Sequence, residues 1–198
     1  MGRVTANHRY IYREIGFQRD TYLDVLEQYE KAFQAWADDR GGFESGILPM
    51  ELSQRLQGIK FSIVINVAAF VEAMINFHLS KSLSSEQFQK IERKPPAKKW
   101  LEEFNRIDKR FSIDTGTELY HLVEKLFETR NSIMHMKPTI LDENKKEVHK
   151  GLNPQAICAQ QDDKALILSW TELPNSLLKR MEECLPEPEV RLTKYLGF

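Results

Sequence analysis

The stretch Ile59-Lys-Phe-Ser-Ile-Val-Ile-Asn-Val-Ala-Ala-Phe-Val-Glu-Ala-Met-Ile-Asn-Phe-His-Leu79 is the most apolar part of this chain of 198 residues. Drawn as a helix, it has apolar side chains nearly all round, so it should be a central helix that is covered on most sides. It is long enough to span a bilayer, but it carries the polar or charged residues Lys60, Ser62, Asn66, Glu72, Asn76 and His78. Because a carboxylate at mid-segment costs about 3 kcal/mol in a bilayer, a buried core helix is the better interpretation, and no membrane contact is expected.

A narrow stripe of small and polar residues interrupts this apolar helix. Its members fall at steps of three and four: Ser62, Asn66, Ala69, Glu72 or Ala73, and Asn76. Burying a carboxylate without a partner is costly, so Glu72 should have a hydrogen-bond donor from another helix. The sequence leaves open whether that donor belongs to a functional site or only satisfies a structural carboxylate.

The residues before the central helix predict an arm and one amphipathic helix. Residues 1–17 show no clear period and are expected to form an N-terminal arm or a frayed first helix. From Gln18 to Asp39 apolar side chains recur every three or four residues, which is one helical face. Arg40–Gly46 should end that helix, and the central helix is expected from about Met50 to Lys81.

Two short helices are predicted next. Ser84 and Gln87 stand in capping-box spacing at the start of a helix over 84–91, and a proline pair precedes another over 97–107. Residues 90–110 carry eight Lys or Arg against four Asp or Glu. A solvated helical face is the favoured interpretation of this charge, and a patch that steers phosphate groups, with Lys98 and Lys99 in it, is the alternative.

A further core helix should begin at an Asp114 or Thr115 cap and end near Met136, because Pro138 disfavours helical geometry at the residue before it. Its last turns hold Arg130, Asn131 and His135. Asn131 and His135 share a face of the helix, and an arginine and an imidazole are side chains suited to a phosphodiester. By spacing alone, however, a helix end whose Arg and His cover its last carbonyls is favoured over a site.

The pattern changes after Pro138. Thr139–Gln161 has short β-prone pieces between turn residues, and Ala165–Trp170 is predicted to be a strand, which together suggest a hairpin or a three-stranded flap. A last helix is expected over Leu173–Leu185, before a tail that ends at Phe198. The expected organisation is thus an arm (1–17), a helical core (18–138), a flap (139–170), and a C-terminal helix and tail of the same domain (171–198).

The composition excludes several classes of protein. The net charge is −1, so any site for a polyanion must be a local patch. Cys158 and Cys184 match no metal spacing and are expected to be thiols in a reducing cytoplasm. The sequence contains no glycine-rich phosphate loop, zinc-type cluster or nucleophile elbow, so no metal or cofactor is expected. The N-terminus lacks the apolar region of a secretory signal.

Two segments resemble a known family. Arg130-Asn-Ser-Ile-Met-His135 has the form R-polar-x3-H of the motif R-x4–6-H of the HEPN superfamily, at the end of a late core helix. Ala68–Leu79 resembles the long central helix of that family, which often carries an acidic residue facing the motif. The resemblance covers about 18–136 and, loosely, the helix over 173–185. It implies an all-α, HEPN-like antiparallel helical bundle. The small β-rich or irregular insertion predicted after the motif helix is not part of the minimal family domain, and its role is open.

The resemblance also implies a function. Family members with an intact motif are typically metal-independent endoribonucleases of toxins and phage-defence proteins, and they dimerise so that two motifs meet in one cleft. His135 would exchange protons and leave a 2′,3′-cyclic phosphate, Arg130 would stabilise the developing charge, and Asn131 would orient His135 or bind the phosphate. Glu72 and Asn76 would support these residues. The expected RNA contacts are Lys98, Lys99 and Lys137.

Two alternatives stay open, namely a non-catalytic HEPN domain that binds RNA or a nucleotide or acts as a dimerising module, and a purely structural motif. An antitoxin or regulatory protein is a further expected partner. Toxins of the family that are paired with a nucleotidyltransferase antitoxin usually have a tyrosine two residues after the histidine, where this chain has Lys137. Regulation by modification of that tyrosine is therefore not expected.

Overall fold

The computed structural model describes residues 4–38, 50–107, 113–134 and 163–184. Every regular element within these ranges is a helix, and none is a strand. The prediction of an all-α fold is therefore confirmed for this part of the chain. The predicted flap over 139–161 lies outside the described residues.

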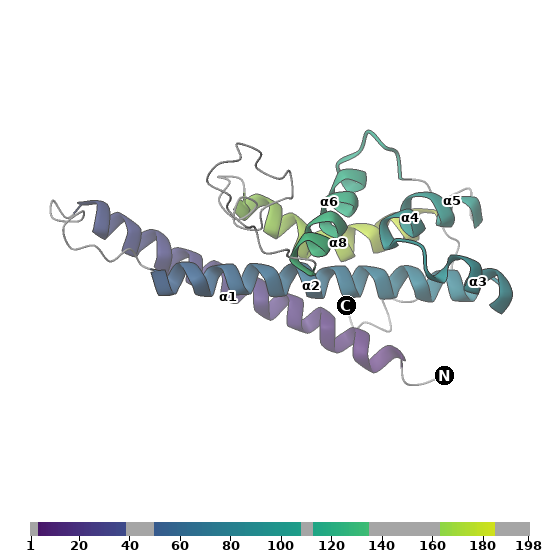
Figure 1. Cartoon of the computed structure of the whole chain (residues 1–198), viewed down its shortest axis with the longest axis horizontal. Coiled ribbons are helices and arrows are strands. Elements are labelled where there is room, and N and C mark those ends of the chain that lie inside the picture. The colour runs from purple at the N-terminus through teal and green to yellow at the C-terminus, as the bar shows by residue number, and fades with distance from the viewer. Residues whose placement is uncertain (1–3, 39–49, 108–112, 135–162, 185–198) are drawn as a thin grey trace, which may run out of the picture.

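Two long helices run antiparallel through the molecule (Figure 1). They are α1 (Val4–Asp38) and α2 (Met50–Ser82), and α2 matches the predicted central helix. The first helix begins at Val4 and not at Gln18, so residues 4–17 belong to α1. Of the two predicted alternatives for this stretch, the structure therefore agrees with a first helix and not with an arm. The reason is packing, because the buried Ile15 extends the inward face that Tyr22 and Val25 form further along α1.

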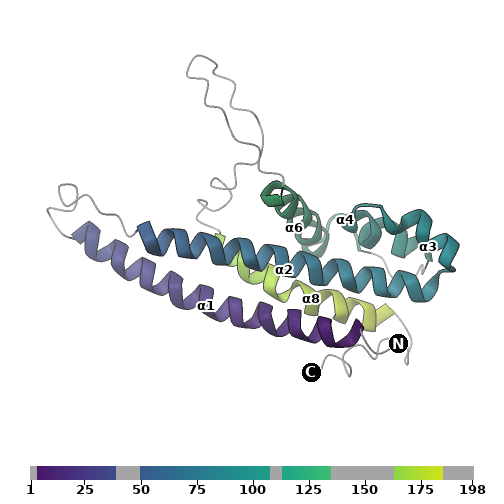
Figure 2. The same cartoon turned by 60° about the horizontal axis from the view of Figure 1, so that its bottom comes forward.

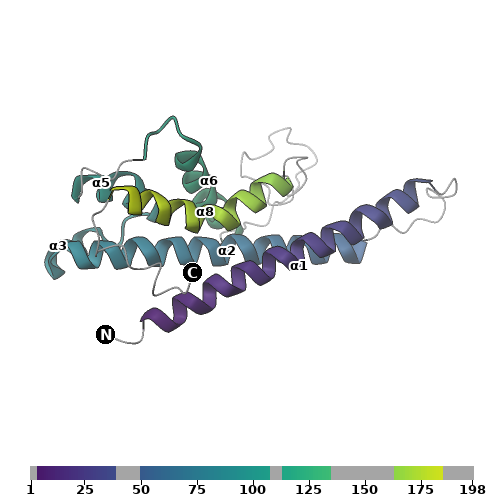
Figure 3. The ribbon, with the colours of Figure 1, turned by 180° about the vertical axis from the view of Figure 1, so that it is seen from behind.

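The other helices cover α2. The helix α6 (Glu118–Met134) runs across it, and α8 (Asp163–Cys184) packs against α2, α6 and α1, as Figures 1, 2 and 3 show from different sides. The short helix α3 (Ser85–Glu92) follows the end of α2. Next comes one helical stretch made of α4 (Pro96–Lys98), the π-helical turn η1 (Lys99–Glu103) and α5 (Phe104–Ile107).

Two tryptophans connect the covering helices to one another and to α2. Trp100 and Trp170 are fully buried. The Trp100 Nε1–H donates to the Val71 carbonyl at 3.0 Å and so fixes η1 on α2, while the Trp170 Nε1–H donates to the Leu122 carbonyl at 3.3 Å and joins α8 to α6. Each ring therefore combines a large buried apolar area with a satisfied polar atom.

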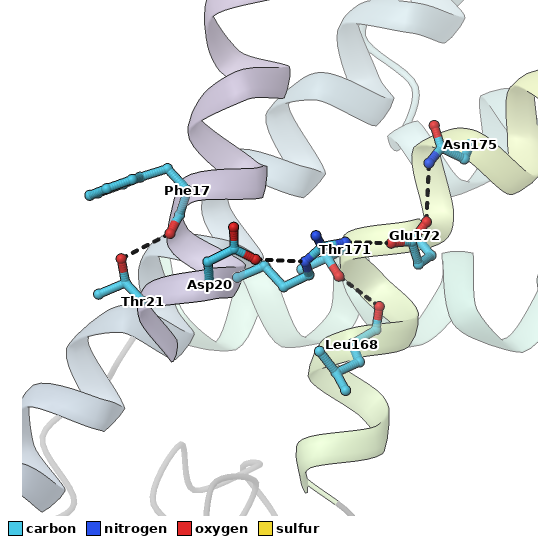
Figure 4. A network of polar contacts seen from close by, with 8 residues as sticks. Phe17, Asp20, Thr21, Leu168, Thr171, Glu172 and Asn175 are labelled. Carbon is cyan, nitrogen blue, oxygen red and sulfur yellow. Dashed lines mark hydrogen bonds and ion pairs between the residues drawn. The ribbon is translucent and has the colours of Figure 1, made fainter. Parts of the chain in front are cut away.

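Polar contacts cap the helices and connect α1 to α8. Ser84 and Gln87 form the predicted capping box of α3. Thr117, and not the predicted Asp114 or Thr115, caps α6, because its Oγ1 accepts from the Tyr120 backbone N–H at 3.4 Å. Arg19 of α1 pairs with Glu172 of α8, with Nη1 of Arg19 2.8 Å from Oε1 of Glu172. Figure 4 shows Glu172 on α8, where it also accepts a hydrogen bond from Asn175. The pair of Arg19 and Glu172 is half-exposed, so it contributes no more than about 1 kcal/mol.

The predicted strand Ala165–Trp170 is wrong, because these residues form the first turns of α8. A short apolar run does not by its period distinguish a strand from a buried helix. The helical pattern becomes clear only when the run is extended through its buried residues: Ile167, Trp170, Leu173, Leu177, Leu178 and Met181. Pro174 lies inside α8. Because a proline usually marks the end or the start of a helix, its presence argues against one continuous helix in the sequence.

Among the described helices, α2 is the one that is long and apolar enough to cross a membrane by length and composition. Half of the most apolar stretch of α2 is buried inside the protein, against the surrounding helices. The same composition is expected of a core helix in a globular bundle, which is the role that α2 has in this fold.

Candidate functional site

The end of α6 lies against the middle of α2. Val123, Leu126, Phe127 and Ile133 are the buried apolar residues that seat α6 on its neighbours. Arg130 stands one helical turn after Leu126, at the edge of this buried face, so its side chain is half-buried and reaches the surface of α2. Asn131, the next residue, is exposed.

Arg130 contacts one residue of α2 and one of its own helix. Its Nη2 lies 3.5 Å from Oε2 of Glu72, and its Nη1–H donates to Oδ1 of Asn131 at 2.9 Å. The Arg130 and Glu72 side chains are 34% and 31% exposed. Glu72 thus has the donor from another helix that its place in an apolar helix predicts, although the pair is only half-buried and is long for a charge-assisted hydrogen bond.

A second polar contact is formed one turn further along α2. The Lys99 ammonium of η1 donates to Oδ1 of Asn76 at 2.8 Å and to the Glu92 carbonyl of α3 at 2.5 Å. The Lys99 side chain is buried, with 1% of the residue exposed. Burial lowers the pKa of Lys99, and the charges of Glu72 and Glu92 partly oppose that shift.

A π-helical turn accompanies the burial of this lysine. Trp100 occupies the core next to α2, and because successive residues of a regular α-helix are about 100° apart, regular spacing alone would not place Lys99 on the same face. The π-helical turn, closed by the Phe104 N–H on the Lys99 carbonyl, widens that face so that Lys99, Trp100 and Glu103 all point inward. Single π turns of this kind occur often at functional sites.

The structure brings together only some of the predicted site residues. Glu72, Arg130 and Asn131 form one contact chain, and Asn76 and Lys99 form a second beside it. Lys98 is exposed, as a steering residue should be, whereas Lys99 is buried and not on an exposed face as expected. His135 and Lys137 lie outside the described residues.

Asn66, which the sequence placed in the same polar stripe, does not join this cluster. Its Nδ2–H donates to Oε1 of Gln18 on α1 at 3.1 Å. This hydrogen bond joins α2 to α1, on a different side of α2 from Glu72. The site on α2 consists of Glu72 and Asn76.

Arg130 and Lys99 each contribute one positive charge to the cluster and Glu72 contributes one negative charge, while Glu92 of α3 adds a negative charge beside Lys99. The half-exposed guanidinium is the end that solvent reaches, so a single anionic group such as a phosphate is the ligand that the arrangement suits best. Among the described residues, no group of three or more His, Cys, Asp or Glu side chains is arranged to hold a metal ion.

Comparison of the chain with protein-family models, with curated proteins and with solved structures found no match.

Proposed function

We propose that the chain is a metal-independent endoribonuclease of the HEPN type, acting as a homodimer in which the motifs of two protomers meet. The observation that carries the proposal is the contact of Arg130 with Glu72 across α6 and α2, which joins the two segments that resemble the family. Toxin or phage-defence activity is the biological setting that this resemblance implies.

The geometry of Arg130 suits a ligand-binding role. The contacts with Glu72 and Asn131 use two of the five N–H donors that a guanidinium has. The remaining donors belong to a side chain that is a third exposed, and the Glu72 oxygen is distant enough to share the guanidinium with a phosphate. Arg130 would then stabilise the negative charge that develops on the phosphorus oxygens in the transition state.

His135 supplies the proton chemistry of the proposed reaction. Removal of the proton from the ribose 2′-hydroxyl lets that oxygen attack the phosphorus, and the 5′-oxygen leaves with a proton. The products are a 2′,3′-cyclic phosphate and a 5′-hydroxyl end, so the reaction needs no metal. Asn131, which already contacts Arg130, would orient that guanidinium together with the phosphate.

A purely structural role of Arg130 would require its contact with Glu72 to make a large contribution to the stability of the fold. An ion pair whose two partners are each about a third exposed contributes less than about 1 kcal/mol to stability. For a chain of this size, that corresponds to a decrease of no more than about 4 °C in melting temperature. Arg130→Ala should therefore yield a folded, inactive protein, and a much larger loss of stability would favour the structural role.

The test is cleavage of mixed RNA in the presence of EDTA, with mass spectrometry of the fragment ends. Wild type should leave cyclic phosphates, and His135→Ala and Arg130→Ala should not. Arg180→Ala is the matched control, because Arg180 is 37% exposed and contacts Glu183 at 3.2 Å, away from the motif. Equal cleavage by wild type and His135→Ala, or no cleavage of a broad substrate panel, would refute the proposal. RNA binding that persists in His135→Ala without cleavage would instead support a non-catalytic HEPN domain.

A further inference from the structure

Lys99 is a charged residue in an unusual place. Its side chain is buried, and its ammonium is held by Asn76 of α2 and by the Glu92 carbonyl of α3. Removing an ammonium from water is costly unless nearby groups compensate it. Neither contact is with a carboxylate, so the compensating negative charges act from further away, and they are those of Glu72 and Glu92.

The other buried carboxylate in this region does not depend on Lys99. Glu103 is 8% exposed in its side chain, and it pairs with Lys94 at 2.6 Å and with Arg106 at 3.1 Å. Glu103 thus has two cations of its own. The buried Lys99 charge therefore acts chiefly on the cluster along α2, which contains Glu72 and, through it, Arg130.

We propose that Lys99 is a positioning residue of the Arg130 site: held by Asn76, its ammonium offsets the charge of Glu72 from the inner side, so that Arg130 keeps a net attraction for a phosphate group. The inference rests on the part of the proposed function that places a phosphate at Arg130. The charges of Arg130, Glu72 and Lys99 sum to +1, and without Lys99 those of Arg130 and Glu72 sum to zero, while the charge of Glu92 is the same in every variant.

Binding of an uncleavable probe tests this directly. The probe is a fluorescein-labelled single-stranded RNA with 2′-O-methyl riboses, which lack the attacking hydroxyl, and the readout is fluorescence anisotropy at fixed salt. Lys99→Met should weaken binding about fivefold to tenfold, the effect of one unit charge at a partly screened site. Lys31→Met is the control, because it removes the same charge from an exposed residue of α1 outside the predicted RNA contacts, and it should change binding by less than about twofold.

The summed charge of Arg130, Glu72 and Lys99 predicts the affinity of the remaining variants for the probe. Lys99→Arg should retain the affinity of wild type, and Glu72→Gln should bind the probe more tightly, because its cluster carries +2. The double variant of Lys99→Met and Glu72→Gln has the wild-type sum of +1 and should regain wild-type affinity. In an Arg130→Ala background, Lys99→Met should have little further effect. Circular dichroism of every variant reports whether it is folded, and Glu72→Gln keeps the proposal testable if Lys99→Met does not fold.

The pH dependence gives a readout that packing alone would not change. The groups that face Lys99 are Glu72 of α2 and Glu92 of α3, with Arg130 of α6 beyond Glu72. Because burial lowers the pKa of Lys99 below its ordinary 10.5, probe affinity in wild type should fall in alkaline solution as Lys99 loses its proton. Lys99→Arg stays charged and should lack this step.

The outcomes separate this inference from the ribonuclease. A wild type that cleaves no RNA but shows the predicted order of affinities refutes the ribonuclease and supports the role of Lys99. Cleavage of RNA with equal probe binding by wild type and Lys99→Met overturns the role of Lys99 and leaves the ribonuclease standing. Equal losses in Lys31→Met and Lys99→Met, or no binding of the probe to wild type, also overturn it.

Discussion

The buried His78 on α2 should make the protein unstable in mildly acidic solution. Its ring is 7% exposed, packs against Phe77 and Phe104, and has an Nε2 atom without a hydrogen-bond partner within the described residues. Burial lowers the pKa of His78 from 6.5 to about 4. Because the charged imidazole is favoured only after unfolding, the unfolded chain takes up a proton at a pH where the folded protein does not.

The size and the sign of the effect follow from that difference. Between pH 6.5 and about pH 4 the unfolded state binds more protons, so the free energy of unfolding falls as the pH falls. One pKa unit corresponds to about 1.4 kcal/mol, so the total loss across this window is about 3 kcal/mol, of which about 2 kcal/mol is lost by pH 5. The contribution is fully present above pH 6.5 and is gone below pH 4.

The assay is urea denaturation at several pH values between 4.5 and 7.5, with circular dichroism and tryptophan fluorescence as probes. His78→Leu removes the titrating group with little change in volume, so at pH 7.5 it should lie within about 1.5 kcal/mol of wild type. At pH 5 the difference between variant and wild type should have moved by about 2 kcal/mol in favour of the variant. Parallel stability curves for the two proteins across this range would refute the reasoning, because histidines elsewhere are common to both.

Two further predictions concern the helices that position the site. Ser84→Ala removes the capping box of α3 and should cost about 1 kcal/mol, measured by thermal melting, whereas Ser85→Ala, an exposed residue at the start of the same helix, should cost less than about 0.5 kcal/mol. Equal losses would mean that the cap contributes nothing special. Trp100→Phe keeps most of the buried ring but loses the donor to the Val71 carbonyl, so it should cost about 1–2 kcal/mol in urea denaturation. An unchanged midpoint would show that this hydrogen bond does not fasten η1 to α2.

The features that were predicted from the sequence depend on local chemistry. The capping box of Ser84 and Gln87 needs only the two residues and the backbone between them, so spacing alone reveals it. The central place of α2 follows from the apolar surface that begins at Ile59. The start of α1 was not placed because residues 4–17 mix aromatic and basic side chains without a clear period, although Ile15 is buried.

α8 shows where local patterns mislead. Leu166, Ile167 and Leu168 with Trp170 fit a strand, and Pro174 argues for a boundary beside it. The bundle overrides both signals, because a helix here buries Trp170 against Leu122 and continues through Pro174 to Met181. Tertiary packing of this kind is absent from any short window of sequence.

The polar residues on and beside α2 show which parts of the candidate site can be predicted from the sequence. Asn66 and Glu72 were predicted to share one polar stripe, but they are six residues apart, or about 120° around a helix, which is too wide for a single narrow face. The structure follows this arithmetic, with Asn66 on Gln18 and Glu72 on Arg130. The burial of Lys99 has no such local sign, because a lysine beside a core tryptophan can equally extend its stem outward. Its inward position depends on Asn76, which is 23 residues away in the sequence. The residue that sets the charge of the site is thus the one that only the packing of η1 on α2 reveals.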